Sequence, residues 1–154
     1  MIYLTIIAGL FALDQLIKKH IENQPGDQFP RPLKGSKGLI TLYKNHNPGL
    51  MMGFLQGKYD LPKWIPFGTI IGVLSYFIYS LTHKMPAASR LSLSLILAGA
   101  FSNLIDRFHY GYVVDYFSIN IKKLKRVVFN LGDMFIFLGS LLILITETIR
   151  DLRS

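Results

Sequence analysis

The chain has 154 residues, of which 51% are apolar and 17% are charged, and its formal net charge is +8. This length suits one domain, and so large an apolar share excludes most soluble domains and favours membrane spans. The absence of cysteine excludes disulfides, thiol nucleophiles and cysteine-ligated metal sites.

The positive charge is interpreted as contact with anionic lipid head groups, because the chain is so apolar. No basic stripe with interleaved stacking aromatics accompanies it, so we do not expect a nucleic-acid partner. The four histidines show no metal-ligand spacing; they are His20, His46, His83 and His109. We therefore expect membrane lipids as partners, and neither a metal ion nor another cofactor.

Four apolar runs predict transmembrane helices, because about 20 helical residues cross the ~30 Å hydrocarbon core of a bilayer. The runs cover residues about 2–21, 61–83, 91–108 and 128–149. The first has no basic region ahead of it and no small-residue cleavage site behind it, so a removable signal peptide is not expected. The predicted fold is a single all-α membrane domain over residues 1–154.

Short segments outside these runs predict a small β-sheet on the membrane surface. Leu39–Tyr43 and Tyr112–Ile119 have the composition of strands. Met51–Leu55 is a candidate partner for the first strand across a turn at residues 47–49. Its large flexible or aromatic side chains are Met51, Met52 and Phe54. They either contact lipid or substrate, because methionine adapts to irregular apolar shapes, or form the core of the sheet.

Polar residues gather at one end of the predicted bundle. Four spans place both termini on one side of the membrane, so the polar ends of the helices meet on the other side. The residues that gather there are Asp14, Lys18, Asp106, Asp115, Asn130 and Asp133. Because an acid at membrane depth is costly, such a cluster indicates a functional site.

Two of these acids, Asp115 and Asp133, suit acid–base chemistry on water. Two carboxylates close together share one proton, and burial favours that state because it raises both pKa values. Asp133 begins a helix, whose N-terminus stabilises a carboxylate, and Asn130 lies three residues earlier on about the same face. The alternative is that both acids only cap a helix or anchor a loop, a frequent use of aspartate.

The other charged residues near this end have alternative interpretations. Asp14 and Lys18 share a helix face, and form either an ion pair with Lys18 reaching the interface or a support for the polar site. Asp106 is interpreted as structural, paired with a loop cation. Its neighbour Arg107 points to another side of the helix and is interpreted as holding a phosphate or a carbonyl group.

Positive charge is unevenly divided between the two membrane faces. Of the Lys and Arg residues, 13 lie on the polar-site side and four on the other side. A plain positive-inside count would place the polar site in the cytoplasm. That rule weakens where the charges belong to a folded extramembranous element.

Five short motifs follow one another along the chain. They are D-Q-x-x-K at Asp14, Gln15 and Lys18; N-x-G at Asn47 and Gly49; N-x-x-D-R at Asn103, Asp106 and Arg107; V-V-D at Val113–Asp115, followed by Tyr116; and F-N-x-x-D at Phe129, Asn130 and Asp133. Together, and in this order between four spans, they resemble the signal peptidase II (lipoprotein signal peptidase) family. The resemblance covers nearly the whole chain.

The resemblance implies an aspartyl endopeptidase of the bacterial cytoplasmic membrane. Such an enzyme removes the signal peptide from diacylglyceryl-modified prolipoproteins, cutting before the lipidated cysteine. Its catalytic pair maps onto Asp115 and Asp133. Its supporting and substrate-binding residues map onto Asp14, Lys18, Asn47, Gly49, Asn103, Arg107 and Asn130. The resemblance also implies cytoplasmic termini and a site at the outer face, against the charge count. We expect a monomer.

Several positions depart from the family pattern. They are Pro48, Met51, Met52, Ser102, Gly132 and the basic run Lys122–Arg126. Gly132 is expected to loosen the backbone beside Asp133. These departures leave two alternatives open: a paralogue that binds lipidated peptides without cutting them, and a protease of altered specificity. A membrane ion or proton transporter is a further alternative, although its acids would be spaced across the bilayer.

Overall fold

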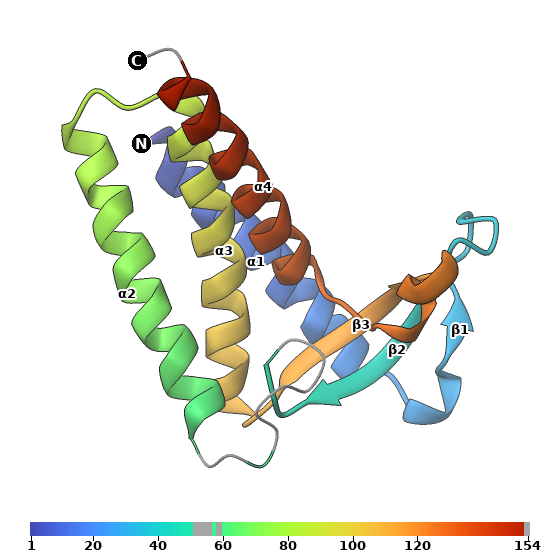
Figure 1. The fold of residues 1–154 in the computed structure, drawn as a ribbon. Helices are drawn as coiled ribbons and strands as arrows, with labels where there is room; N and C mark the ends of the chain where they lie inside the picture. The colour runs from blue at the N-terminus through green and yellow to red at the C-terminus, as the bar shows by residue number, and fades with distance from the viewer. Residues whose placement is uncertain (51–56, 58–59, 153–154) are drawn as a thin grey trace.

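Four long helices form the body of the protein in a computed structural model that describes residues 1–50, 57 and 60–152. The helices are α1 (Ile2–Glu22), α2 (Leu61–Thr82), α3 (Ala87–His109) and α4 (Leu131–Asp151). They run side by side, with both termini at one end of the bundle (Figure 1). The predicted membrane fold of four helices and a small sheet is confirmed, although individual helix ends differ from those expected.

Three of the described helices, α2, α3 and α4, are long and apolar enough to cross a membrane. Helix α1 has a similar length but carries Asp14 and Lys18. Both side chains point into the protein, since Asp14 is 0% exposed and Lys18 is 2% exposed. The outer face of α1 remains apolar, with Leu4, Leu13 and Leu16 exposed. Helix α1 therefore presents the same kind of surface to lipid as the other three.

Helix α3 is the central helix and contacts the other three. Its contact with α4 is close because glycines face the neighbouring backbone. A Cβ atom on Gly99 would lie 2.1 Å from the carbonyl oxygen of Gly132, and one on Gly139 would lie 2.6 Å from the carbonyl oxygen of Ser92. The start of α4 can therefore lie directly against the middle of α3. On the other side of α3, the apolar core comprises Ile70, Phe77, Leu93, Leu97 and Leu104.

A three-stranded antiparallel sheet projects sideways from the end of the bundle opposite the termini (Figure 1). Its strands are β1 (Arg31–Pro32), β2 (Ile40–Asn47) and β3 (Val113–Ile119), in that order across the sheet. Both predicted strands are present, and the first extends further than expected, to Asn47. Its partners are β1 and β3. The segment proposed as its partner, Met51–Leu55, lies outside the described residues.

An irregularity in β2 decides which face of the sheet Asn47 occupies. Leu42 lies opposite Phe117, but Asn45 lies opposite Asp115, so one extra residue is accommodated between Leu42 and Asn45. Because side chains alternate along a strand, this bulge moves Asn47 to the face that carries Asp115. Without it, Asn47 would point to the opposite face.

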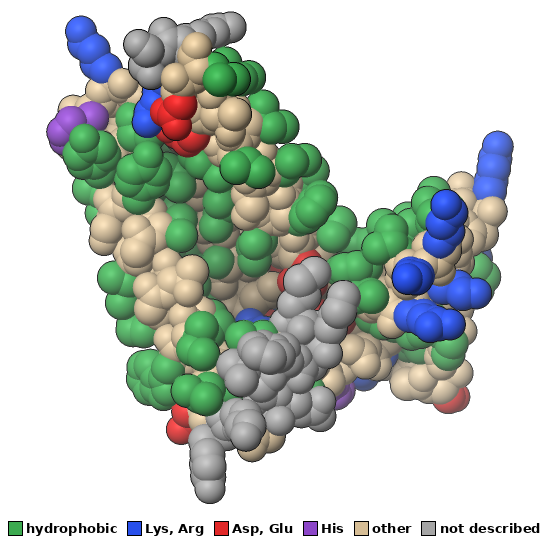
Figure 2. Space-filling model, viewed as in Figure 1, with side chains coloured by type: hydrophobic (Ala, Val, Ile, Leu, Met, Phe, Trp, Pro, Cys, Tyr) green, Lys and Arg blue, Asp and Glu red, His purple; other side chains and the backbone are tan. Residues whose placement is uncertain are grey.

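An open hollow lies between the bundle and the sheet. Figure 2 shows hydrophobic side chains along both of its sides and acidic atoms at its base. Lys and Arg side chains gather on the sheet. One contribution is the basic run Lys122–Arg126, which forms an exposed 3₁₀ helix, η3, between β3 and α4. A second short 3₁₀ helix, η1 (Gly26–Gln28), lies between α1 and β1.

Candidate active site

Asp115 is a buried carboxylate on β3, with 3% of its surface exposed. Its Oδ2 accepts a hydrogen bond from Asn47 Nδ2 at 3.1 Å, and its Oδ1 accepts one from Asn130 Nδ2 at 2.8 Å. Burial and the nearby charge of Asp133 raise the pKa of Asp115 from 3.8 to about 7, although both hydrogen bonds act to lower it. Asp115 therefore holds a proton in a large fraction of molecules near neutral pH.

Asp133 lies in the first turn of α4, where it completes a capping box with Asn130. The backbone N–H of Asn130 donates to Asp133 Oδ2 at 3.2 Å, and the backbone N–H of Asp133 donates to Asn130 Oδ1 at 2.8 Å. Asn103 Nδ2 donates to the other carboxylate oxygen, Oδ1, at 2.8 Å. Asp133 therefore caps its helix, as the alternative interpretation held, and N–H donors of Asn130 and Asn103 hold both of its carboxylate oxygens.

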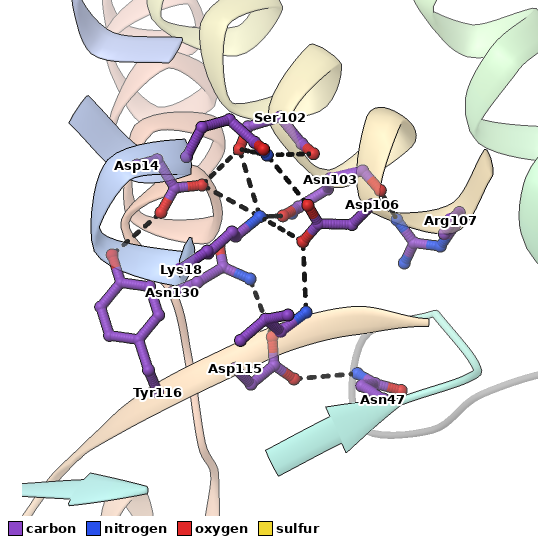
Figure 3. A network of polar contacts seen from close by, with 12 residues as sticks. Asp14, Lys18, Asn47, Ser102, Asn103, Asp106, Arg107, Asp115, Tyr116 and Asn130 are labelled. Atoms are coloured by element: carbon purple, nitrogen blue, oxygen red, sulfur yellow. Dashed lines mark hydrogen bonds and ion pairs between the residues drawn. The ribbon is translucent and has the colours of Figure 1, made fainter. Parts of the chain in front are cut away.

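Asn130 joins the two aspartates, as Figure 3 shows for its contact with Asp115. Its side-chain nitrogen donates to Asp115, and its side-chain oxygen accepts from the backbone of Asp133. The side chain of Asn130 is fully buried. One side chain therefore fixes the end of β3 against the start of α4, and brings together two acids that lie on different elements.

A buried ion cluster supports Asp133 from the side of α1. Lys18 Nζ lies 3.0 Å from Asp14 Oδ2 and 2.9 Å from Asp106 Oδ2. It also donates to Asn103 Oδ1 at 2.8 Å and to Ser102 Oγ at 3.2 Å (Figure 3). The interpretation in which Lys18 reaches the interface is wrong, because its partners lie inside the bundle. The predicted loop cation for Asp106 is likewise wrong, since its partner is Lys18 of α1.

Arg107 connects α3 to the segment after β2. Its Nη2 donates to the carbonyl oxygen of Gly49 at 3.0 Å, and its Nη1 donates to that of Asn103 at 3.0 Å. The interpretation that Arg107 holds a carbonyl group is confirmed. Asn47 Oδ1 accepts from the backbone N–H of Gly49 at 3.1 Å. Arg107 and Gly49 therefore hold in place the same asparagine that donates to Asp115.

Three polar residues in this network were not predicted from the sequence. Gln15 Nε2 donates to Asp106 Oδ1 at 2.9 Å. The hydroxyl groups of Ser102 and Tyr116 donate to the two oxygens of Asp14, at 2.5 Å and 2.9 Å. Each of the three is next in sequence to a residue that was predicted, and Gln15 is also a member of the D-Q-x-x-K motif, so both signals could have identified them.

The glycine beside Asp133 has a packing role. A Cβ atom on Gly132 would lie 3.0 Å from Asn130 Oδ1 and 3.0 Å from Asp14 Oδ2. These distances are shorter than ordinary contacts, so a side chain here would push against two polar groups of the network. Two of the other departures, Met51 and Met52, lie outside the described residues.

The sequence profile of the family described as "Signal peptidase (SPase) II" matches residues 6–149. The chain belongs to the signal peptidase II family. It is 34% identical to the lipoprotein signal peptidase of Clostridioides difficile, with 100% of this chain and 99% of the relative covered. It is 36% identical to that of Moorella thermoacetica, with 92% and 89% covered.

Two solved structures have the same architecture as this signal peptidase II chain. One bacterial membrane enzyme, determined by the in meso method at 2.3 Å, superposes with a TM-score of 0.78 at 26% identity, covering 97% of this chain and 88% of that chain. A second, at 1.9 Å, gives a TM-score of 0.74 at 26% identity, covering 93% and 90%. This likeness extends the family assignment from sequence to fold. The family and its lipoprotein signal peptidase relatives make the protein a membrane protease of the aspartic type.

Proposed function

We propose that this protein removes signal peptides from prolipoproteins, cutting before the cysteine that carries diacylglycerol. One observation carries the proposal: Asp115 and Asp133, from separate elements, are joined by Asn130 in a buried polar network. The relatives named lipoprotein signal peptidase support the substrate class. We further propose that residues 1–154 act as one monomeric peptidase unit.

The surroundings of the two aspartates suggest how they divide the chemistry. Asp115, whose pKa is raised to about 7, carries the shared proton. Asp133, held by N–H donors at the start of α4, is the base that takes a proton from water. Water oxygen bonds to the carbonyl carbon while Asp115 protonates the carbonyl oxygen. The C–N bond then breaks as Asp133 gives its proton to the leaving amine, and one hydroxyl of the tetrahedral intermediate returns a proton to Asp115.

The remaining residues of the network have supporting roles in this proposal. They are Asp14, Lys18, Asn47, Gly49, Asn103, Arg107 and Asn130. The asparagines orient the two carboxylates. The cation Lys18 offsets the free-energy cost of negative charge buried at this depth of the membrane. The acids gather at one end of the bundle, which argues against a proton relay across the bilayer.

The first test is cleavage of a diacylglyceryl-modified prolipoprotein by the purified protein in detergent, read as a gel shift. We expect a shift to the mature size with the modified substrate and none with the unmodified precursor. A folded protein that binds the modified substrate without producing mature product would contradict the proposal and support the binding paralogue. A pH change in protein-loaded vesicles would support the transporter instead.

Asn47→Ala is expected to move the alkaline limb of the rate profile to higher pH. The dyad needs the proton on Asp115, so the wild-type rate falls as the pH rises through about 7. The hydrogen bond from Asn47 lowers the pKa of Asp115, so its loss raises that pKa and shifts the limb upward by roughly half to one pH unit. The measurement is kcat against pH.

The matched control for this variant is Asn45→Ala on the same strand. The side chain of Asn45 is exposed, and no hydrogen bond from it to a described residue is present. We expect its rate profile to coincide with that of the wild type. A limb that stays in place, or moves to lower pH, in Asn47→Ala would show that Asp115 does not carry the titrating proton.

We also propose that the protein lies in the bacterial cytoplasmic membrane with both termini in the cytoplasm and the site at the outer face. Many of the basic residues on the site side belong to the folded sheet and η3, which weakens the positive-inside count against this orientation. Because the chain contains no cysteine, single cysteines report orientation cleanly. A membrane-impermeant thiol reagent applied to intact spheroplasts should label Lys34→Cys and spare Lys84→Cys; the reverse pattern would invert the proposed topology.

A further inference from the structure

Tyr116 connects three elements of the site through its hydroxyl group. Its Oη donates to Asp14 Oδ1 on α1 at 2.9 Å (Figure 3) and accepts from the backbone N–H of Leu131 at 2.9 Å. The side chain is 4% exposed, so water cannot replace these bonds easily. Both bonding directions of the hydroxyl are therefore used inside the protein.

These bonds lie between the two aspartates along the covalent chain. Tyr116 directly follows Asp115 on β3, and Leu131 begins α4 two residues before Asp133. The N–H of Leu131 is one of the free donors at a helix start and needs an acceptor. The hydroxyl of Tyr116 is that acceptor, and it therefore fixes the strand that carries Asp115 to the helix that carries Asp133.

Asp14 gives this connection a rigid anchor. Its second oxygen, Oδ2, accepts from Ser102 Oγ on α3 at 2.5 Å and lies 3.0 Å from Lys18 Nζ. Asp14 is fully buried and cannot turn without breaking these contacts. A hydroxyl bonded to it is held against both α1 and α3.

We propose that Tyr116 is a positioning residue for peptide cleavage: its hydroxyl, anchored on Asp14, sets the spacing between Asp115 and the start of α4. The inference rests on the proposed function. Asn130 supplies one link between the two aspartates, and Tyr116 supplies a second on the side facing α1. The backbone bridge between Phe117 and Phe129 holds β3 beside the residues before α4, and the two side-chain links orient the carboxylates within that frame.

The test is Tyr116→Phe, which removes only the hydroxyl oxygen. We expect kcat to fall by about tenfold because misplaced reacting groups lose orientation. KM should stay unchanged, since the hydroxyl is occupied by Asp14 and Leu131 and is not free for substrate.

A shift in the rate profile separates positioning from a simple loss of folded protein. The charged groups facing Asp115 are Asp133 on α4, Lys18 on α1 and Arg107 on α3. If the start of α4 relaxes away from β3, the charge of Asp133 acts on Asp115 from further away. The alkaline limb should then move to lower pH, opposite to the shift expected for Asn47→Ala. A smaller folded fraction lowers the rate by the same factor at every pH and leaves the alkaline limb of the rate profile at the same pH.

Tyr112→Phe is the matched control, because it removes a hydroxyl just before the same strand. The ring of Tyr112 stacks on His46 at 4.1 Å, a contact that phenylalanine keeps. We expect wild-type kcat and the wild-type limb in this variant. Ser102→Ala, which removes the other hydroxyl on Asp14, should shift the limb in the same direction as Tyr116→Phe and by less, and it serves if Tyr116→Phe does not fold.

The outcomes are distinct. A drop in kcat with the limb moved to lower pH supports the inference. Tyr116→Phe with wild-type kcat, or with a lower kcat and an unmoved limb, overturns it while the proposed function stands. A wild-type protein that does not cleave overturns the proposed function and this inference together.

Discussion

Asp115→Asn and Asp133→Asn are each expected to reduce cleavage of a diacylglyceryl-modified prolipoprotein by about a thousandfold or more. Either substitution removes a group that must take up or release a proton, and asparagine can do neither. The shape of the side chain is kept, so the hydrogen bonds with Asn130 and Asn103 can largely re-form. The measurement is the single-turnover rate beside the thermal unfolding temperature.

The matched control is Asp27→Asn, an exposed acid in η1 remote from the bundle interior. We expect it to cleave at the wild-type rate. The double variant of Asp115 and Asp133 should be no slower than the slower single variant, because residues that act as a unit are not additive. Full activity in either single variant would refute the dyad. Two additive moderate losses would indicate separate supporting roles.

Lys18→Met is expected to cause the largest loss of stability, roughly 3–5 kcal/mol in the free energy of unfolding. Lys18 is the cation for both Asp14 and Asp106, and all three side chains are buried. Methionine fills a similar volume but leaves two carboxylates without a counter-charge inside the bundle. The measurement is thermal unfolding in detergent, followed by the cleavage rate of the remaining folded protein.

Lys63→Met provides the matched control for an ion pair at the surface. Lys63 lies 3.6 Å from Asp60, and Asp60 is 66% exposed, so this pair should contribute less than about 1 kcal/mol. Neutralising the acids together with the lysine, as Lys18→Met with Asp14→Asn and Asp106→Asn, should recover part of the lost stability. A lone Lys18→Met variant as stable as Lys63→Met would contradict the interpretation of a buried counter-charge.

The two predictions separate two tasks within one network. Asp115 and Asp133 lie where the sheet meets the start of α4. Lys18 and its partners lie deeper between α1 and α3 and reach Asp133 through Asn103. Substitutions at the first place are therefore expected to change the rate at constant stability, and substitutions at the second to change stability first.

The helical membrane body and its polar end could be predicted from residues that lie close together in the chain. Apolar runs and the spacing of Asp14 and Lys18 are local properties, because a helix buries one face according to residues three and four apart. Strands β2 and β3 were also predictable from local sequence, namely from their composition and the flanking glycine and asparagine residues. The motif order then indicated the family, which the sequence comparisons confirm.

The way in which the polar residues meet depends on contacts between distant segments and could not be predicted locally. The bulge between Leu42 and Asn45 turns Asn47 toward Asp115, and the local sequence of β2 does not predict this bulge. Ser102 and Tyr116 reach Asp14 across 88 and 102 residues of chain. Such contacts depend on strand register and on the close approach of α3 and α4 at Gly99, which are properties of packed elements and not of any one segment.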